Sequence, residues 1–431
     1  MRNRTFLKYI FLGALVFSML FQLNPNTMVT AESKELDTVT AGFIYVGPIG
    51  DYGWTNAHDS ARVIVDDKYD WLDTVYVESI GEDPASVVAA VDAMLAATDA
   101  PDIIFTTSFG FMDGTVQAAE KYPDTMFFHA SGYKRAANMG TYMADFYQIY
   151  YLNGLMAGAL TESDKLGYVG AFPIPEVIRH INAFAIGAKE ANPDATVDVR
   201  WINSWYDPTA AKNAANALIA DGVDMLAFTE DSPAVVEVAD ETDGVYAFSH
   251  YSPMQSYGPE STISGQLVHW EVIYDEVLTK VKDGTYTSTN LVNEDYLYFI
   301  HENGVELGGE FGVPINPLFE DDLKGVNIGD DTAYDLIFDR IDQMNDSWAD
   351  VDFDPFMGPI KAQNGTVMIA DGERASIPDL FSDMMWFVDN VKGSTTGEDP
   401  DETESAPPDF VAITFGFAAI AVVQYRRRRK D

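Results

Sequence analysis

Short apolar runs alternate with longer amphipathic stretches from residue 40 to about residue 270. Helical patterns separate the runs, as in residues 83–100, which open with Asp83 as the N-cap and Pro84 at the first helical position. The first four apolar runs are rich in β-branched and aromatic residues, as buried strands are. They are GFIYVG (42–47), DTVYVESI (73–80), DIIFTTS (102–108) and TMFFHAS (125–131). This order predicts parallel strands joined by helices.

A second series of the same kind follows the first along the chain. Its predicted strands lie at 165–173, 195–205, 224–231 and 244–251, with helices at 175–193 and 207–222. Because each series supplies about four strands, we expect two doubly wound α/β lobes and not one long sheet. Residues 142–164 are predicted to link the lobes as a buried helix, since Asn153 and Gly154 interrupt an apolar run that is too polar to span a membrane.

The composition fits two folded lobes with an unusually acidic surface. Of 431 residues 47% are hydrophobic, and 26 Phe and 22 Tyr can fill sizeable cores. The sequence has no cysteine, which excludes disulfides, thiolate metal sites, a cysteine nucleophile and a lipid anchor on an N-terminal cysteine. The net charge of −42 argues against nucleic acid or anionic lipid as a partner. Such a surface suits high salt, which screens its repulsion, and suggests a halophilic archaeal host.

The first 31 residues have the pattern of an export signal. A basic start is followed by an apolar core at 9–21 and by small residues at 29–31 that suit cleavage. The alternative is an uncleaved N-terminal anchor. With either outcome, we expect the body of the protein to lie outside the cytoplasm.

The C-terminus carries a second membrane signal. Residues 393–409 read as an acidic Ser/Thr/Pro stalk, 410–425 as a membrane anchor, and 426–431 as a basic cytoplasmic tail. The apolar run would span about 24 Å as a helix, which is short for a bilayer, although the arginines that follow can snorkel. The alternative is a sorting tail that is removed later.

Candidate binding residues follow the predicted strands. Ligands of open α/β sheets bind beyond the carboxyl ends of the strands, and here nearly every such turn pairs an aromatic ring with a polar group. Paired rings can sandwich a flat ligand, and carboxylates accept hydrogen bonds from its N–H or O–H groups. A single loop tryptophan is more often a packing residue, so the argument rests on this recurrence. The residues are Asp51, Tyr52, Trp54, Phe109, Phe111, Trp205, Tyr206, Asp231, Ser232, His250, His269 and Trp270.

Catalytic patterns are weak by comparison. The sequence contains no G-x-S-x-G elbow, H-E-x-x-H pair or phosphate-binding P-loop. Its six histidines give no metal-ligand spacing. We therefore expect a binding protein and not an enzyme, with no cofactor and no metal.

Long blocks of the chain resemble the basic membrane protein (BMP) family, the purine-nucleoside-receptor type of substrate-binding protein of ABC transporters. The resemblance covers roughly residues 40–392. The blocks that carry it include GFIYVGPIGDYGWTNAHDSAR (42–62), the segments 102–142 and 167–208, DSPA (231–234), FDPFMGPIKAQNGTV (353–367) and MMWFVDNV (384–391).

The resemblance implies a type I periplasmic-binding-protein fold, in which two Rossmann-like lobes are joined by three crossings and close on the ligand by a hinge. By this reading the first lobe comprises about 40–147 plus 272–356. The second lobe comprises about 148–271 plus 357–392. The implied partners are a small-molecule ligand and ABC permease subunits.

The resemblance also implies a purine base or nucleoside as the ligand, with adenine favoured by the Gly-Trp in the segment Asp51–Trp54. Trp54 and Trp205 match the two aromatic residues that clamp the base in the family, Asp231 matches a polar contact, and Phe109 matches a pocket wall. The family commonly has an acid in the segment aligned with SHYSPM, where this chain has His250.

That departure leaves the exact ligand open, as does His269 before Trp270. Two alternatives to transport remain: a ligand sensor that is not coupled to a permease, and an extracellular nucleosidase. Asn345 and Asn364 begin N-x-S/T triplets, which are candidate glycosylation sites in an exported protein.

Overall fold

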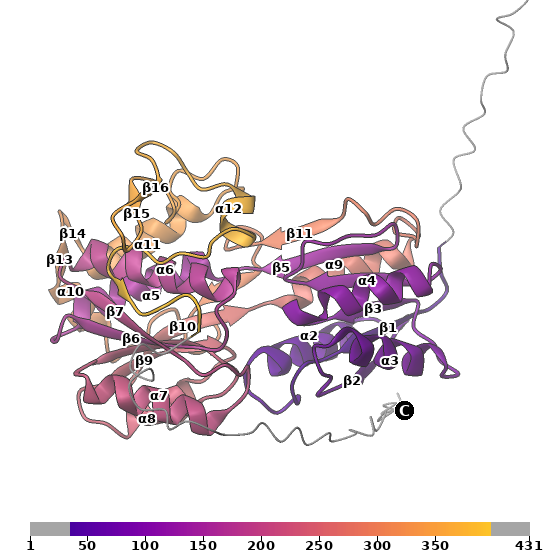
Figure 1. Cartoon of the computed structure of the whole chain (residues 1–431), viewed down its shortest axis with the longest axis horizontal. Coiled ribbons are helices and arrows are strands. Elements are labelled where there is room, and N and C mark those ends of the chain that lie inside the picture. Colours follow the sequence, from indigo (N-terminus) through magenta and orange to yellow (C-terminus); the bar gives the residue numbers. More distant parts are fainter. Residues whose placement is uncertain (1–34, 398–431) are drawn as a thin grey trace, which may run out of the picture. The chain divides into compact units, whose positions relative to one another are not determined.

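The computed structural model describes residues 35–397, which contain two largely parallel β-sheets with helices on both faces (Figure 1). The first sheet has six parallel strands in the order β11-β5-β4-β3-β1-β2. Its strands are β1 (Val39–Ile44), β2 (Leu72–Val77), β3 (Ile103–Thr106), β4 (Met126–Ala130), β5 (Met139–Ala144) and β11 (Asp295–Tyr298).

The inner strands of the first sheet are buried on both faces. Phe43 and Phe105 belong to the core under α2 (Trp54–Lys68) and α9 (Trp270–Lys282). Their neighbours Ile44 and Ile104 belong to the core under α3 (Pro84–Leu95) and α4 (Met112–Lys121). Successive side chains of a strand point to opposite faces, so the continuous apolar runs of the sequence serve both cores.

The second sheet has seven strands in the order β12-β10-β9-β8-β6-β7-β17, and only β12 among them is antiparallel to its neighbour. Helices α5 (Tyr147–Leu160) and α6 (Pro175–Ala191) belong to one core, and α7 (Pro208–Ala220) and α8 (Ala234–Asp240) to another. The strands are β6 (Lys165–Gly170), β7 (Thr196–Trp201), β8 (Met225–Thr229), β9 (Tyr246–Tyr251), β10 (Thr262–Val268), β12 (Val305–Leu307) and β17 (Val391–Lys392). The prediction of two doubly wound lobes is confirmed.

Three passes of the chain join the lobes, and hydrogen bonds tie these passes together. The first pass leads from β5 into α5, the second from β10 into α9, and the third from β11 to β12. The N–H of Asp145 in the first pass donates to the carbonyl of Tyr298 at 2.9 Å, and that of His269 in the second donates to Gly304 at 2.9 Å.

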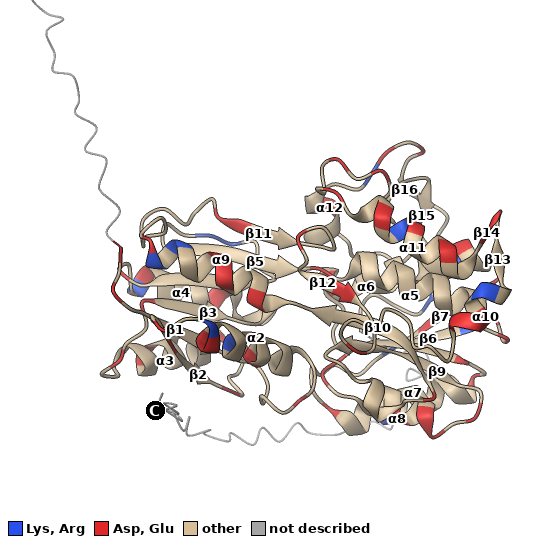
Figure 2. Ribbon diagram, turned by 180° about the vertical axis from the view of Figure 1, so that it is seen from behind, with Lys and Arg blue, Asp and Glu red and all other residues tan. Residues whose placement is uncertain are grey.

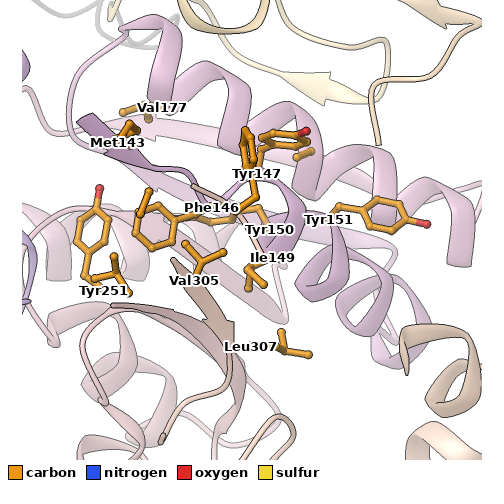
Figure 3. Close-up of a cluster of buried hydrophobic side chains, with 14 of the residues drawn as sticks. Met143, Phe146, Tyr147, Ile149, Tyr150, Tyr151, Val177, Tyr251, Val305 and Leu307 are labelled. Atoms are coloured by element: carbon orange, nitrogen blue, oxygen red, sulfur yellow. The ribbon is translucent and has the colours of Figure 1, made fainter. Parts of the chain in front are cut away.

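Aromatic side chains fill the region where these passes meet (Figure 3). Phe146 packs edge-on against Tyr251 at the end of β9, with ring centroids 5.0 Å apart. Tyr147 packs edge-on against Phe299 of the third pass at 5.5 Å. All four rings are buried, so the crossings share one packed core and are not loose linkers.

The limits of the lobes differ from those predicted after residue 300. The sequence interpretation assigned 272–356 to the first lobe, whereas β12 pairs with β10 of the second sheet and α11 (Ala333–Met344) packs against α5. Val305 and Leu307 are buried there, so a short apolar run joins the second sheet instead of returning to the first. The other short elements are η1 (Phe109–Phe111), η2 (Gln255–Tyr257), α10 (Glu320–Gly325), β13 (Asn327–Ile328), β14 (Asp331–Thr332), β15 (Ile360–Lys361), β16 (Val367–Ile369) and α12 (Ile377–Phe381).

Several predicted features concern the ends of the chain and its surface. The predicted signal, the stalk from residue 398, the anchor and the basic tail lie outside the described residues. Within 35–397, no helix is long and apolar enough to cross a membrane. Figure 2 shows Asp and Glu on helices and loops of both lobes, so the acidic character of the sequence is not confined to one patch.

Candidate functional site

A cavity lies where the carboxyl ends of strands from both sheets meet. Its free volume is about 20 Å³, room for about one water molecule, so the two lobes lie close together around it. The first lobe lines it with Val46, Trp54, Ser108 and Phe109, and the second lobe lines it with Glu176, Trp205, Asp231 and Tyr251. The structure therefore brings four predicted site residues together: Trp54, Phe109, Trp205 and Asp231.

Trp54 is held rigidly on the side of the first lobe. It is the first residue of α2 and only 7% exposed. Its indole N–H donates to the carbonyl of Thr107, just beyond β3. The ring meets Tyr251 and Trp270 edge-on, with each pair of centroids 5.2 Å apart. The sequence left two roles open for Trp54, a packing residue or a ligand contact. In the structure the residue packs against the core and also lines the cavity.

Phe109 and Trp205 contribute aromatic surface from opposite lobes. Phe109 begins η1 in the turn after β3, and Trp205 lies half-buried in the loop between β7 and α7. The ring of Phe172 packs edge-on against Trp205 at 5.0 Å. The Trp205 indole N–H donates to the carboxylate of Glu82 in the first lobe, 3.3 Å from each oxygen.

Asp231 connects the two lobes at the cavity. One oxygen of its carboxylate accepts from the backbone N–H of Trp54 at 2.9 Å, and its own N–H donates to the carbonyl of Trp205 at 2.7 Å. Burial raises the pKa of the Asp231 carboxyl well above its ordinary value, and the nearby charge of Asp51 raises it further. A buried carboxyl of this kind can accept hydrogen bonds from a ligand, or donate one while it is protonated.

Asp51 lies behind the cavity and not in its lining. Its carboxylate accepts from the backbone N–H groups of Gly53 and Asn56 at 2.9 Å and of Thr55 at 3.2 Å. Burial raises its pKa to about 6, against the lowering effect of these hydrogen bonds. The sequence interpretation made Asp51 a candidate binding residue, whereas in the structure its carboxylate accepts from the N–H groups at the start of α2.

Tyr52 contacts the opposite lobe outside the cavity. Its side chain is 46% exposed, and its ring meets Tyr257 of the second lobe edge-on at 5.3 Å. Next to it, Gly53 permits the close approach of the lobes. A Cβ added at Gly53 would lie 2.4 Å from the Cα of Asp231, a separation that real side chains do not tolerate.

His250 and Trp270 are fully buried and do not line the cavity. His250 bonds through Nδ1 with the Tyr150 hydroxyl at 2.9 Å, and burial lowers its pKa well below the ordinary value. Trp270 stacks on His58 with centroids 4.3 Å apart and supports Trp54 from behind. At the end of β9 it is the next residue, Tyr251, that reaches the cavity.

The sequence interpretation also missed Glu176. It is the second residue of α6, after Pro175, and its buried carboxylate accepts from the hydroxyl of Ser131 in the first lobe. Burial raises the pKa of Glu176. The signal in the sequence was its place in the turn after a predicted strand, at a helix start, where other candidates were identified by an aromatic neighbour.

Comparison with known proteins identifies the family. Residues 38–329 match the Bmp family, described as ABC transporter substrate-binding protein PnrA-like. The chain belongs to this family of substrate-binding proteins. TsgA13 of Haloferax volcanii, named as a glucose-binding protein of an ABC transporter, is 38% identical over 84% of this chain and 82% of its own length. A purine-binding protein of Brucella abortus is 36% identical over 82% of this chain and 93% of its own.

A solved structure shows the same fold as this BMP-family protein. The solute-binding protein of an ABC transporter system from Aeropyrum pernix K1 superimposes with a TM-score of 0.60 at 16% identity, covering 71% of this chain and 91% of that one. The family is one of substrate-binding proteins and not of enzymes, which confirms the prediction of binding over turnover. Proteins of this type bind small molecules and permease components.

The cavity of this BMP-family protein is acidic. Among the described residues that line it, Glu176 and Asp231 supply carboxyl groups and none is Lys, Arg or His. N–H and O–H donors of a ligand find acceptors in this lining. Within residues 35–397, no cluster of three His, Asp or Glu side chains could hold a metal ion.

A larger hollow of about 360 Å³ lies at the crossings beside α11. Its lining includes Ile149, His269, Ile300 and Phe338, and none of the predicted site residues that meet in the first cavity. The candidate ligand site of this BMP-family protein is therefore the smaller cavity between the strand ends.

Proposed function

We propose that this protein is the extracytoplasmic receptor of an ABC importer, and that it binds a purine base, with adenine favoured, between its two lobes. The observation that carries the proposal is one cavity lined by aromatic residues from both lobes, Trp54 and Phe109 from the first and Trp205 from the second, together with Asp231. Aromatic rings stack on every purine, and carboxyl groups can pair with the N–H groups and ring nitrogens at its edge.

One relative supports a purine as the ligand, and another points to a sugar as the alternative. The Brucella abortus relative is named for purine binding, and the Haloferax volcanii relative is named for glucose binding. Sugars also pack on aromatic rings and donate O–H groups to carboxylates. The pKa values of the Asp231 and Glu176 carboxyls are raised, and a protonated carboxyl both donates and accepts hydrogen bonds. The edge of a purine also has both donors and acceptors, which favours a purine base over a sugar.

Ligand capture would then depend on closure of the lobes. A ligand that binds both lobes stabilises the closed form by its differential affinity for that form, and the permease would recognise the closed receptor. We further propose that residues 1–31 direct export and that residues 410–425 keep the protein at the outer face of the membrane. The anchor would replace the lipidated cysteine that this sequence does not have.

Thermal unfolding of the full chain in high salt tests the proposal. Adenine, guanine, adenosine, guanosine, inosine and glucose are each added in excess. A ligand at 100 times its dissociation constant adds about 2.7 kcal/mol to the free energy of unfolding, which is easily detected. Stabilisation by adenine above the other compounds supports the proposal. Stabilisation by glucose alone would replace the purine with a sugar. Base released from a nucleoside on long incubation would support the nucleosidase alternative.

A further inference from the structure

Glu82 lies in the loop between β2 and α3, directly before the helix cap Asp83. It does not line the cavity, yet its carboxylate accepts three hydrogen bonds from residues around it. The donors are the hydroxyl of Ser108 at 2.5 Å, the backbone N–H of Gly110 at 3.2 Å and the indole N–H of Trp205 at 3.3 Å.

Two of these donors flank Phe109 in the first lobe. Ser108 precedes Phe109 and Gly110 follows it, so one carboxylate oxygen holds the turn that carries this ring. The contact is close: a Cβ added at Gly110 would lie 2.5 Å from that oxygen. The Glu82 carboxylate therefore packs closely against the turn that carries Phe109. This contact lies within the first lobe and does not depend on closure of the two lobes.

The third donor belongs to the other lobe. Trp205 follows β7 of the second sheet, so its hydrogen bond to Glu82 joins the two lobes. A tryptophan ring has one N–H, and its partner fixes the rotation of the ring. Because this acceptor carries a charge, the bond is stronger than one to a neutral group.

We propose that Glu82 is a positioning residue that fixes both aromatic walls of the cavity, Phe109 within its own lobe and Trp205 across the cleft. The inference rests on the proposed function, because the spacing of the walls matters for affinity when a flat ligand lies between them. Glu82 acts through these two rings and makes no contact with the ligand.

Fluorine NMR of the full chain labelled with 5-fluorotryptophan tests the contact directly. The Trp205 resonance is assigned by its loss in Trp205→Phe, and spectra are recorded without ligand and with saturating adenine. Glu82→Ala should move the Trp205 resonance in at least one of the two states. Glu82→Gln keeps an acceptor oxygen and should restore most of the wild-type position. Adenine affinity, measured by calorimetry, should fall about tenfold in Glu82→Ala, as expected for the loss of a charge-assisted hydrogen bond.

Glu78→Ala is the matched control. Glu78 precedes Glu82 in the same loop and accepts from the backbone N–H of Ile49 at 2.8 Å, so this variant removes an equal charge without touching either wall. It should leave the Trp205 resonance in place and change adenine affinity by less than about twofold. An unmoved Trp205 resonance in Glu82→Ala, with and without adenine, would overturn the inference. If adenine does not bind to the wild type, the proposed function fails, and the ligand-free spectra still decide the role of Glu82.

Discussion

The backbone N–H of Trp54 in the first lobe donates a hydrogen bond of 2.9 Å to the carboxylate of Asp231 in the second lobe. Glu82 and Trp205 make the reverse arrangement, with the acceptor in the first lobe and the donor in the second. Glu176 of the second lobe accepts from Ser131 of the first. Three carboxylates around one cavity therefore each accept a hydrogen bond from the opposite lobe.

The close approach at Gly53 gives a first prediction. Gly53→Ala should weaken adenine binding by about 100-fold or more, because its Cβ would lie 2.4 Å from the Cα of Asp231 and closure would be blocked. Calorimetry gives the affinity, and small-angle scattering shows whether adenine still compacts the protein. Gly50→Ala is the control, since a Cβ there meets nothing within 4 Å. Equal affinities for the two variants would mean that binding does not need this interlobe contact.

A second prediction concerns stacking. Trp205→Ala should weaken adenine binding by about 1–3 kcal/mol, the usual contribution of a base stacked on an aromatic side chain. Tyr206→Ala is the neighbouring control, because Tyr206 is 43% exposed and does not line the cavity. The affinities come from calorimetry, with circular dichroism to verify folding. Unchanged affinity in folded Trp205→Ala would remove this residue from the binding site.

The buried carboxyl of Asp51 predicts an unusual dependence on pH. Its pKa is raised by burial to about 6 in the folded protein, above the value of 3.8 for an unperturbed aspartate. The folded state therefore holds this proton more tightly than the unfolded state. The stabilisation is complete below pH 3.8 and is lost as the pH rises through about 6. The loss amounts to at most about 1.4 kcal/mol per pH unit for one proton.

Asp51→Asn isolates this contribution. The free energy of unfolding is measured by denaturant titration from pH 4 to pH 7 in constant high salt. Relative to the wild type, the variant should become more stable as the pH rises, because it has no carboxyl to ionise at this site. A difference between the two proteins that stays constant across the range would show that Asp51 keeps an ordinary pKa.

The C-terminal anchor is tested by truncation. Deletion of residues 410–431 should release the protein from the membrane fraction into the medium, because the predicted anchor would be lost while both lobes stay complete. Fractionation of host cells followed by immunoblotting measures the distribution. As a control, Arg426–Arg429 are changed to Gln in the full chain, which keeps the apolar run. Retention of the truncated protein in the membrane fraction would show that another segment holds it there.

Sequence reasoning was most successful where a local pattern settles the structure. Apolar runs separated by capped helices predict two doubly wound lobes, and Asp83 indeed accepts from the N–H of Ser86 at the start of α3. Positions after strand ends identified Trp54, Phe109, Trp205 and Asp231, because parallel strands bring their carboxyl ends to one edge of the sheet. The periodicity of a strand is visible in a single sequence.

The direction in which a side chain points beyond a strand end could not be predicted from the sequence. Asp51 turns back to α2, His250 turns to Tyr150 of α5, and Trp270 packs on His58. Each follows a pattern similar to that of Trp54. Which of them reaches the cavity depends on the packing of neighbouring helices, and that packing joins residues far apart in the chain.

The sequence by itself determined the family, the two-lobe α/β architecture and the edge of each sheet where a ligand belongs, because these follow from residues close together in the chain. The tertiary structure alone decided the course of the chain after residue 300 and the roles of Glu82 and Glu176. Glu82 meets Trp205 more than a hundred residues away and Glu176 meets Ser131 in the other lobe. Such hydrogen bonds exist only where two separately folded lobes approach, and no local pattern encodes that approach.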